Sequence, residues 1–213
     1  MMKNKLFIAF ILAFILTACI KHYTYKSSYV GYYYVPEFLK VDVAGKSPNF
    51  KISILFDSYT DYSVMSVGEE KETYNKYAEY YGDTNFMRDD DDHGGPYVSC
   101  NPLALITVTC NQDWDANHPA GTPLDDLIAA SVQSEKKQIE SNYKETNNFF
   151  YYSKLTDIDY IELRPFSHII YLYMPSSVDK HGKYEFTITV GFDQDPITSK
   201  NVSVEPVTVE IEY

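Results

Sequence analysis

No stretch of this sequence is apolar for long enough to cross a membrane as a helix. The longest candidate, Leu6–Ala18, contains about 13 apolar or small residues, whereas a spanning helix needs about 20. The chain also lacks the Gly-x-Ser-x-Gly, His-Glu-x-x-His and glycine-rich phosphate-binding motifs of several large enzyme classes. An enzyme is therefore the less expected class of protein.

Basic residues are scarce. The chain has 18 Lys and Arg against 30 Asp and Glu, which gives a net charge of −12 at pH 7. Without residues 1–18, which carry two lysines and no acid, the charge is −14. A chain this acidic repels the phosphates of nucleic acids and of anionic lipid headgroups. The composition therefore excludes nucleic acid as an expected partner.

Cysteine is rare too, with three residues in 213. Cys100 and Cys110 flank the segment Leu103–Thr109, whose residue types predict a strand. Such a strand separates its ends by about 20 Å, whereas a disulfide needs Cα atoms within about 7 Å. Only the turn at Asn101-Pro102 could fold Cys100 back, so the sequence leaves open both a disulfide and two free thiols.

The first nineteen residues carry the clearest signal that is present. Two lysines open the chain, an apolar run follows, and the run ends in Leu16-Thr17-Ala18-Cys19. This pattern resembles a bacterial lipoprotein signal peptide, with the tetrapeptide as the lipobox. The resemblance implies that Cys19 becomes the lipidated N-terminus and anchors the protein to the outer membrane. It leaves open whether the domain faces the periplasm or the cell exterior.

We therefore divide the chain into a signal peptide (1–18), a lipidated tether (19–35) and a single domain (36–213). Within the domain, a period-two alternation of apolar and polar residues is strictest in 183–193. Seven or more segments with strand-forming residues predict a mostly β protein, an antiparallel β-sandwich.

A short segment points to one kind of sandwich. Residues 179–186, with Gly182 and Tyr184, resemble the tyrosine corner of immunoglobulin-like and fibronectin-like domains, where the tyrosine hydroxyl bonds to an upstream backbone group. The resemblance implies an immunoglobulin-like β-sandwich in which Tyr184 has a structural role.

Two insertions interrupt the predicted strands. Residues 69–101 are polar and predict a long loop or short helix that projects from the core. Thr122-Pro123-Leu124-Asp125 has the composition of a helix start, with Thr122 as the N-cap and Asp125 completing a capping box. The sequence therefore predicts an inserted helix over about 122–145.

One spacing is compatible with a metal. Asp113, Asp115 and Asn117 alternate as they do at the start of many calcium-binding loops. His118 stands where such loops have glycine, and Leu124 stands where they have a bidentate glutamate. The favoured alternative is that Asp113 and Asn117 cap a tight loop between a strand and a helix. Calcium is the only cofactor that the sequence suggests.

A longer segment, 106–128, resembles a motif of uncharacterised Bacteroidetes-type lipoproteins. The residues that carry this resemblance are Asp113-Trp114-Asp115, His118-Pro119-Ala120-Gly121-Thr122 and Leu124-Asp125-Asp126-Leu127. The resemblance implies lipidation and a β-rich domain, and it implies no activity.

The function expected from these features is that of a membrane-anchored envelope lipoprotein, a non-enzymatic binding or structural module with a protein or glycan partner. The 21 tyrosines suggest one alternative, binding of a carbohydrate or peptide through a tyrosine-rich face, although strand propensity alone favours many tyrosines. A second alternative is a glycoside hydrolase that uses a carboxylate pair. Clustered exposed tyrosines would favour the binder, and two carboxyl groups facing each other in a cleft would favour the hydrolase.

Overall fold

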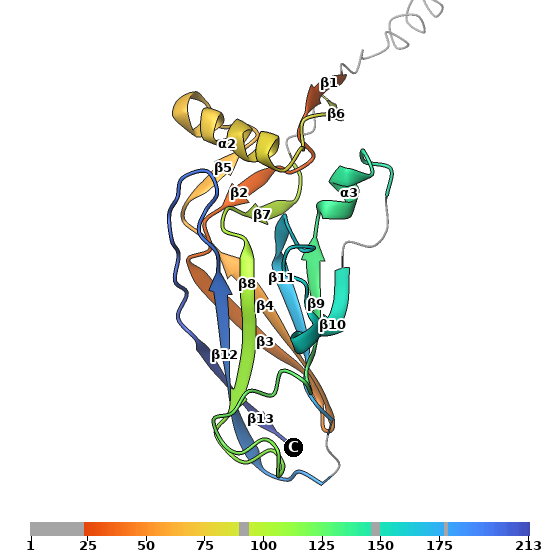
Figure 1. The fold of residues 1–213 in the computed structure, drawn as a ribbon, viewed down its shortest axis with the longest axis vertical. Helices are drawn as coiled ribbons and strands as arrows, with labels where there is room; N and C mark the ends of the chain where they lie inside the picture. The colour runs from red at the N-terminus through yellow and green to blue at the C-terminus, as the bar shows by residue number, and fades with distance from the viewer. Residues whose placement is uncertain (1–23, 90–93, 146–149, 177–178) are drawn as a thin grey trace, which may run out of the picture.

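The computed structural model describes residues 24–213 except 90–93, 146–149 and 177–178. The predicted signal peptide and Cys19 lie outside the described residues. Within that part of the chain the protein is mostly β, with one sizeable helix (Figure 1). The strands are β1 (Thr24–Ser27), β2 (Tyr32–Tyr34), β3 (Phe38–Lys46), β4 (Asn49–Asp57), β5 (Asp61–Ser63), β6 (Phe86–Asp89), β7 (Tyr97–Ser99), β8 (Leu103–Cys110), β9 (Ala129–Ser134), β10 (Phe150–Lys154), β11 (Phe166–Tyr173), β12 (Lys183–Phe192) and β13 (Val207–Glu212). The helices are α2 (Gly68–Tyr80), α3 (Lys136–Glu140) and the 3-10 turn η1 (Leu155–Asp157).

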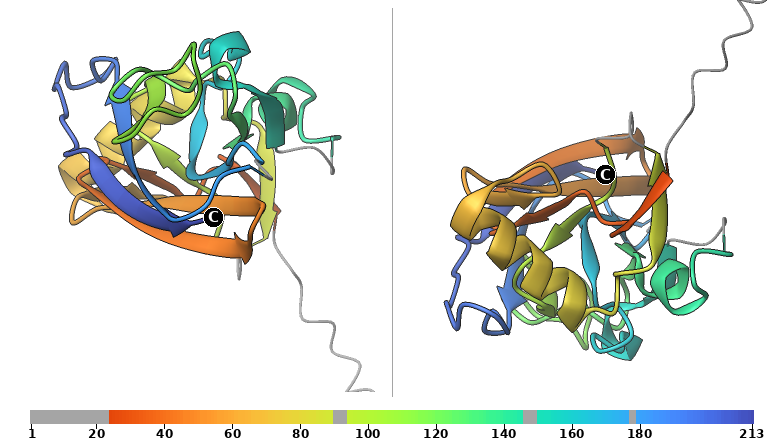
Figure 2. Two further views of the ribbon diagram at one scale, coloured as in Figure 1. Left: turned by 90° about the horizontal axis from the view of Figure 1, so that it is seen from below. Right: turned by 90° about the horizontal axis from the view of Figure 1, so that it is seen from above.

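Two open sheets pack as a sandwich. In the larger sheet β10, β9, β11, β4 and β3 are neighbours, and a branch from β11 continues through β7 and β2 to β5. The smaller sheet contains β8, β12 and β13. Viewed along the long axis, β13 lies beside β3 at the edge of the larger sheet (Figure 2). The predicted mostly β sandwich is therefore confirmed, although β2 pairs with β7 in parallel and the larger sheet is mixed rather than wholly antiparallel.

The interior divides into two hydrophobic clusters. The first, which we call the sandwich core, lies between the two sheets and is mainly aliphatic and aromatic. On β12 it takes every second residue, as the alternation predicts: Tyr184, Phe186, Ile188 and Val190 are buried. The second, which we call the tyrosine cluster, consists of Val30, Tyr33, Val64, Tyr74, Tyr77, Ala78, Val98, Cys100 and Ile139.

The predicted tether is wrong over 24–35, because this segment belongs to the folded domain. Strand β2 lies between β5 and β7, and Val30 and Tyr33 are completely buried. The partners of β2 come from segments far along the chain, so the short local sequence does not indicate a strand on its own. In the described residues the folded domain therefore begins at β1.

The predicted helix over 122–145 is wrong as well. Residues 122–128 form turns, β9 follows, and α3 is only five residues long. The reason is tertiary: β9 pairs on one side with β10 and on the other with β11. Burial between two neighbours stabilises an extended chain more than a capping box stabilises a helix.

The segment 69–101 does contain a helix, as the sequence suggests. Glu69 and Glu70 lie in the first turn of α2, where negative charge favours the helix dipole. Tyr74 and Tyr77 are completely buried on the face toward β2 and β5. The same segment also contributes β6 and β7, so it is part of the fold and not only a projecting loop.

Candidate functional site

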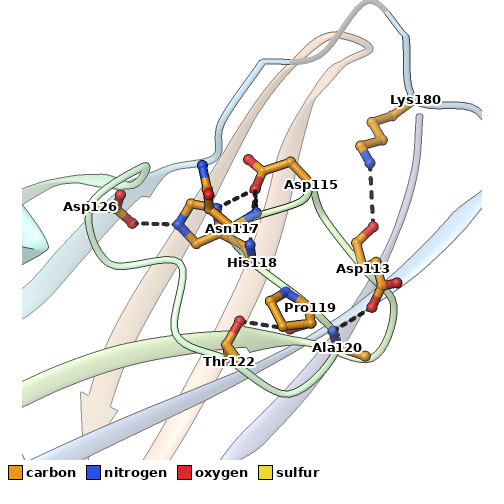
Figure 3. A network of polar contacts seen from close by, with 9 residues as sticks. All are labelled: Asp113, Asp115, Asn117, His118, Pro119, Ala120, Thr122, Asp126 and Lys180. Atoms are coloured by element: carbon orange, nitrogen blue, oxygen red, sulfur yellow. Dashed lines mark hydrogen bonds and ion pairs between the residues drawn. The ribbon is translucent and has the colours of Figure 1, made fainter.

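The loop 111–126, which connects β8 to β9, contains the residues predicted to bind calcium (Figure 3). The carboxylate of Asp113 accepts a hydrogen bond from the backbone N–H of Ala120 at 2.8 Å. Asp115 accepts from the backbone N–H groups of Asn117, at 2.8 Å, and His118, at 2.9 Å. The two carboxylates therefore hold two separate turns.

This geometry supports the capped-loop alternative over a calcium site. The cap is Asp115 rather than Asn117, and no helix follows the loop, so both details of that alternative are corrected. Among the described residues no group of three or more His, Cys, Asp or Glu side chains is placed to hold a metal ion.

His118 joins the two ends of the same loop. Its Nδ1 lies 2.7 Å from Asp115 and its Nε2 lies 3.0 Å from Asp126. Hydrogen bonding to Asp115, aided by Asp126, raises the pKa of the imidazole. Both ring nitrogens thus face carboxylates of the loop, so His118 fastens Asp115 to Asp126.

The two residues predicted to cap a helix also hold this loop. The Thr122 hydroxyl donates to the Pro119 carbonyl, and the Asp125 carboxylate accepts from Val108 N–H and the Thr107 hydroxyl on β8. They are structural, as predicted, but they fasten the loop to the sheet instead of starting a helix.

Tyr184 does not form a tyrosine corner within the described residues. Its ring packs against Trp114, at a centroid distance of 5.8 Å, and against Tyr213, at 5.7 Å. The hydroxyl has no hydrogen-bond partner in the described part of the chain. Tyr184 is thus structural through ring packing, and Trp114 closes the end of the sandwich core.

Cys100 and Cys110 are both buried and free. Cys100 belongs to the tyrosine cluster and Cys110 to the sandwich core, because the intervening strand separates them. The same separation places α2 and the loop 111–126 at opposite ends of the molecule (Figure 1). Helix α2 and the loop 111–126 therefore do not line a common surface.

A row of aromatic side chains crosses the larger sheet instead. It comprises Phe150, Tyr152, Tyr171 and Tyr173, which we call the aromatic strip. The Tyr152 and Tyr173 rings are 5.6 Å apart between centroids, and those of Phe150 and Tyr171 are 5.7 Å apart. Tyr152 is 68% exposed and Phe150 45% exposed.

The small residues of β9 make this row possible. Ser131 lies between Tyr152 on β10 and Tyr171 on β11 in the strand register. Because a serine is short, the rings of the two flanking strands approach one another above it. Lys51 on β4 adds an ammonium 3.8 Å above the Tyr171 ring.

A pocket of about 280 Å³ opens elsewhere on the surface. Its lining residues are Tyr34, Phe56, Asp57, Ser58, Asp61, Tyr97 and His168. Asp57 is hydrogen-bonded by Lys40, and this contact lowers the pKa of its carboxyl. Burial lowers the pKa of His168, so the imidazole is neutral at pH 7.

Two acids with raised pKa values lie at the tyrosine cluster. Asp83 is fully buried and accepts from the backbone N–H groups of Tyr29 (2.7 Å) and Val30 (2.8 Å), and burial raises its pKa. Burial also raises the pKa of Glu135 to about 7. Both side chains are at most 1% exposed, although Asp83 is among the residues that line a second pocket, of about 340 Å³.

Comparisons with protein-family models, curated proteins and solved structures find no match to this chain. In the described residues, no helix combines the length and the apolar character needed to span a bilayer.

The sequence suggested a tyrosine-rich face as one alternative and identified none of the residues of the aromatic strip. The segment 150–154 is too short to show a clear alternation, and its partner Tyr171 becomes a neighbour only through β9. No local sequence pattern predicts the pocket, because its lining residues come from separate segments of the chain.

Proposed function

We propose that this protein is a membrane-anchored envelope lipoprotein whose β-sandwich is a non-enzymatic module that binds a glycan or peptide chain. The observation that carries the proposal is the aromatic strip. Three of its four residues, Phe150, Tyr152 and Tyr173, are exposed, although a folded chain gains about 25 cal/mol for each Å² of apolar surface that it buries. Exposed rings in a row of this kind are typical of a surface that another molecule covers.

The chemistry of the strip suits an extended ligand. Aromatic faces pack against the C–H faces of sugars or the apolar side chains of peptides. The Lys51 ammonium lies above one of the rings and offers hydrogen bonds to hydroxyl or carbonyl groups. A ligand with alternating apolar and polar groups would match this arrangement.

The charges near the pocket support a binder over a glycoside hydrolase. A general acid in that reaction needs a raised pKa. In the pocket, contact with Lys40 lowers the pKa of Asp57. The acids whose pKa values are raised, Asp83 and Glu135, are buried within the protein.

The proposed anchor would also orient the domain. Five residue steps separate Cys19 from Thr24 at the start of β1, and they span at most about 18 Å. With lipid on Cys19, β1 and α2 would face the membrane. The loop 111–126 and the C-terminus, at the other end of the molecule, would point away from it (Figure 1).

Binding is tested by electrophoresis of the protein in gels that contain soluble polysaccharides, together with an array of peptides. We expect retention by at least one ligand, and a loss of about tenfold in affinity for Tyr152→Ala and for Tyr173→Ala, as for aromatic residues at binding hot spots. Tyr80→Ala, an exposed ring on α2, is the matched control. Ligand binding that is equal in all variants would refute the role of the strip.

Anchoring is tested separately. We expect Cys19→Ala to abolish incorporation of labelled palmitate and to release the protein into the soluble envelope fraction, because stable attachment needs the acyl chains. Retained label in this variant would refute the anchor without bearing on ligand binding.

A further inference from the structure

The pocket of about 280 Å³ has aromatic walls. Tyr97 stacks on Tyr32 with a centroid distance of 4.2 Å and an interplanar angle of 7°. That contact covers one face of the Tyr97 ring, while 41% of the residue stays exposed. The His168 and Tyr97 rings pack in a T-shaped arrangement with their centroids 5.8 Å apart. The rings of Tyr34 and Phe56 are buried and complete the lining.

The charge around the pocket is negative. Asp57 and Asp61 line it, and Glu37 stands beside the same loop, where its carboxylate accepts from Tyr59 N–H at 2.9 Å. The cation paired with these acids is Lys40, which contacts Asp57. His168 adds no positive charge at pH 7, because burial lowers its pKa. Asp61 is the exposed carboxylate of the pocket that no lysine or arginine contacts among the described residues.

The aromatic walls and the negative charge of the pocket together favour one class of ligand. An anion would be repelled by the carboxylates. A neutral apolar group would take water away from Asp61 and return no hydrogen bond. A metal ion would need a cluster of His, Cys, Asp or Glu ligands that the described residues do not form. An ammonium group satisfies both features, because it pairs with a carboxylate and is attracted to the negative face of an aromatic ring.

We propose that this pocket binds a primary ammonium group, with Asp61 as the counter-ion and the exposed part of the Tyr97 ring as the cation–π partner. The volume of about 280 Å³ lies just below the usual range for ligand pockets, so it fits the end of a lysine side chain or one amino sugar and not a larger molecule. The site is separate from the aromatic strip and does not depend on the proposed anchor.

Binding is measured by saturation-transfer NMR and calorimetry on the full chain in detergent at pH 7. The probes form two matched pairs that differ in charge. Nα-acetyl-lysine methylamide is paired with the norleucine analogue, and glucosamine is paired with N-acetylglucosamine. We expect the charged member of at least one pair to bind and its neutral partner to bind at least tenfold more weakly. The pair that responds identifies the source of the ammonium group.

Three variants assign the site. Asp61→Asn should weaken ammonium binding about tenfold, as for removal of one partner of a charge pair, and Asp61→Lys should abolish it. Both changes are on an exposed side chain, and their thermal unfolding verifies that they fold. Asp42→Asn, an exposed acid on β3, is the control and should bind as the wild type does.

The outcomes separate cleanly. Ammonium-selective binding that depends on Asp61 supports the proposal. Equal binding of charged and neutral probes, binding that Asp61→Lys leaves intact, or no binding of any probe would each overturn it. None of these results requires the aromatic strip to have a ligand.

Discussion

The sandwich core and the tyrosine cluster are stabilised in different ways. The sandwich core contains apolar side chains that meet face to face between two sheets, with Phe186, Ile188 and Ile170 completely buried. At the tyrosine cluster, burial extends to charged residues: Asp83 and Glu135 are at most 1% exposed. Tyr74 and Tyr77 donate hydrogen bonds at 2.5 Å, to the Val30 carbonyl and to Asp195.

The two regions differ in how strictly their stabilising contacts depend on geometry. Apolar burial depends on area and tolerates small shifts, whereas a buried carboxylate or hydroxyl is stable only with partners in the right geometry. We therefore expect the sandwich core to respond to lost volume, and the tyrosine cluster to respond to the loss of single polar atoms and to pH.

The largest effect should come from the sandwich core. Phe186→Ala removes a fully buried ring that packs against Trp114 and Tyr213. The lost burial and the cavity left behind should lower the free energy of unfolding by about 3–5 kcal/mol. Urea unfolding at pH 7 measures it. A loss below about 1 kcal/mol would show that the core is not tightly packed there.

The next effect should come from the carboxylate that organises the tyrosine cluster. Asp83→Ala leaves the N–H groups of Tyr29 and Val30 buried without their acceptor, so stability should fall by about 2–3 kcal/mol. Asp113→Ala is the matched control, because its carboxylate also caps a backbone N–H but lies in an exposed loop. If the two variants lost equal stability, burial of the N–H groups would not explain the effect of Asp83→Ala.

A pH effect should separate the two regions further. The pKa of Glu135 rises from 4.5 to about 7 on folding, so between these values the folded state holds a proton that the unfolded state has lost. Stability from Glu135 is therefore full below about pH 4.5 and falls as the pH rises toward and through 7, by about 3 kcal/mol.

The variant Glu135→Gln keeps the shape of the side chain without the charge. It should match the wild type near pH 4.5 and exceed it by about 3 kcal/mol at pH 8, as measured by urea unfolding across this range. Glu140→Gln, an exposed site at the end of the same helix, should leave the pH profile unchanged. If Glu135→Gln had the same pH dependence of stability as the wild type, Glu135 would not be the source of that dependence.

The smallest effects compare two tyrosine hydroxyls. Tyr77→Phe removes the donor to Asp195 and should cost about 1 kcal/mol. Tyr184→Phe removes a hydroxyl that has no partner in the described residues, so its cost should lie within about 0.5 kcal/mol of zero. Thermal and urea unfolding of both variants test this. A larger loss of stability for Tyr184→Phe than for Tyr77→Phe would indicate that the Tyr184 hydroxyl does make a hydrogen bond, as in a tyrosine corner.

The two regions also differ in what sequence reasoning could find. The alternation at 183–193 predicts β12 and its buried face correctly, because a strand that is polar on one side needs no other information. The capping box at Thr122 predicts a helix that does not form, because β10 and β11 provide two pairing partners for β9. Residues 24–35 look like a tether for the same reason: their partners are distant in the sequence.

The sequence by itself therefore determined the mostly β class, the buried face of β12 and the acidic charge, since each follows from local periodicity or from composition. Only the tertiary structure decided that Asp115 caps a turn and that Cys100 and Cys110 are separate. It also decided that the aromatic strip is continuous and that Asp61 faces a pocket beside Tyr97. These features depend on contacts between segments that strand pairing brings together, and no local pattern records such pairing.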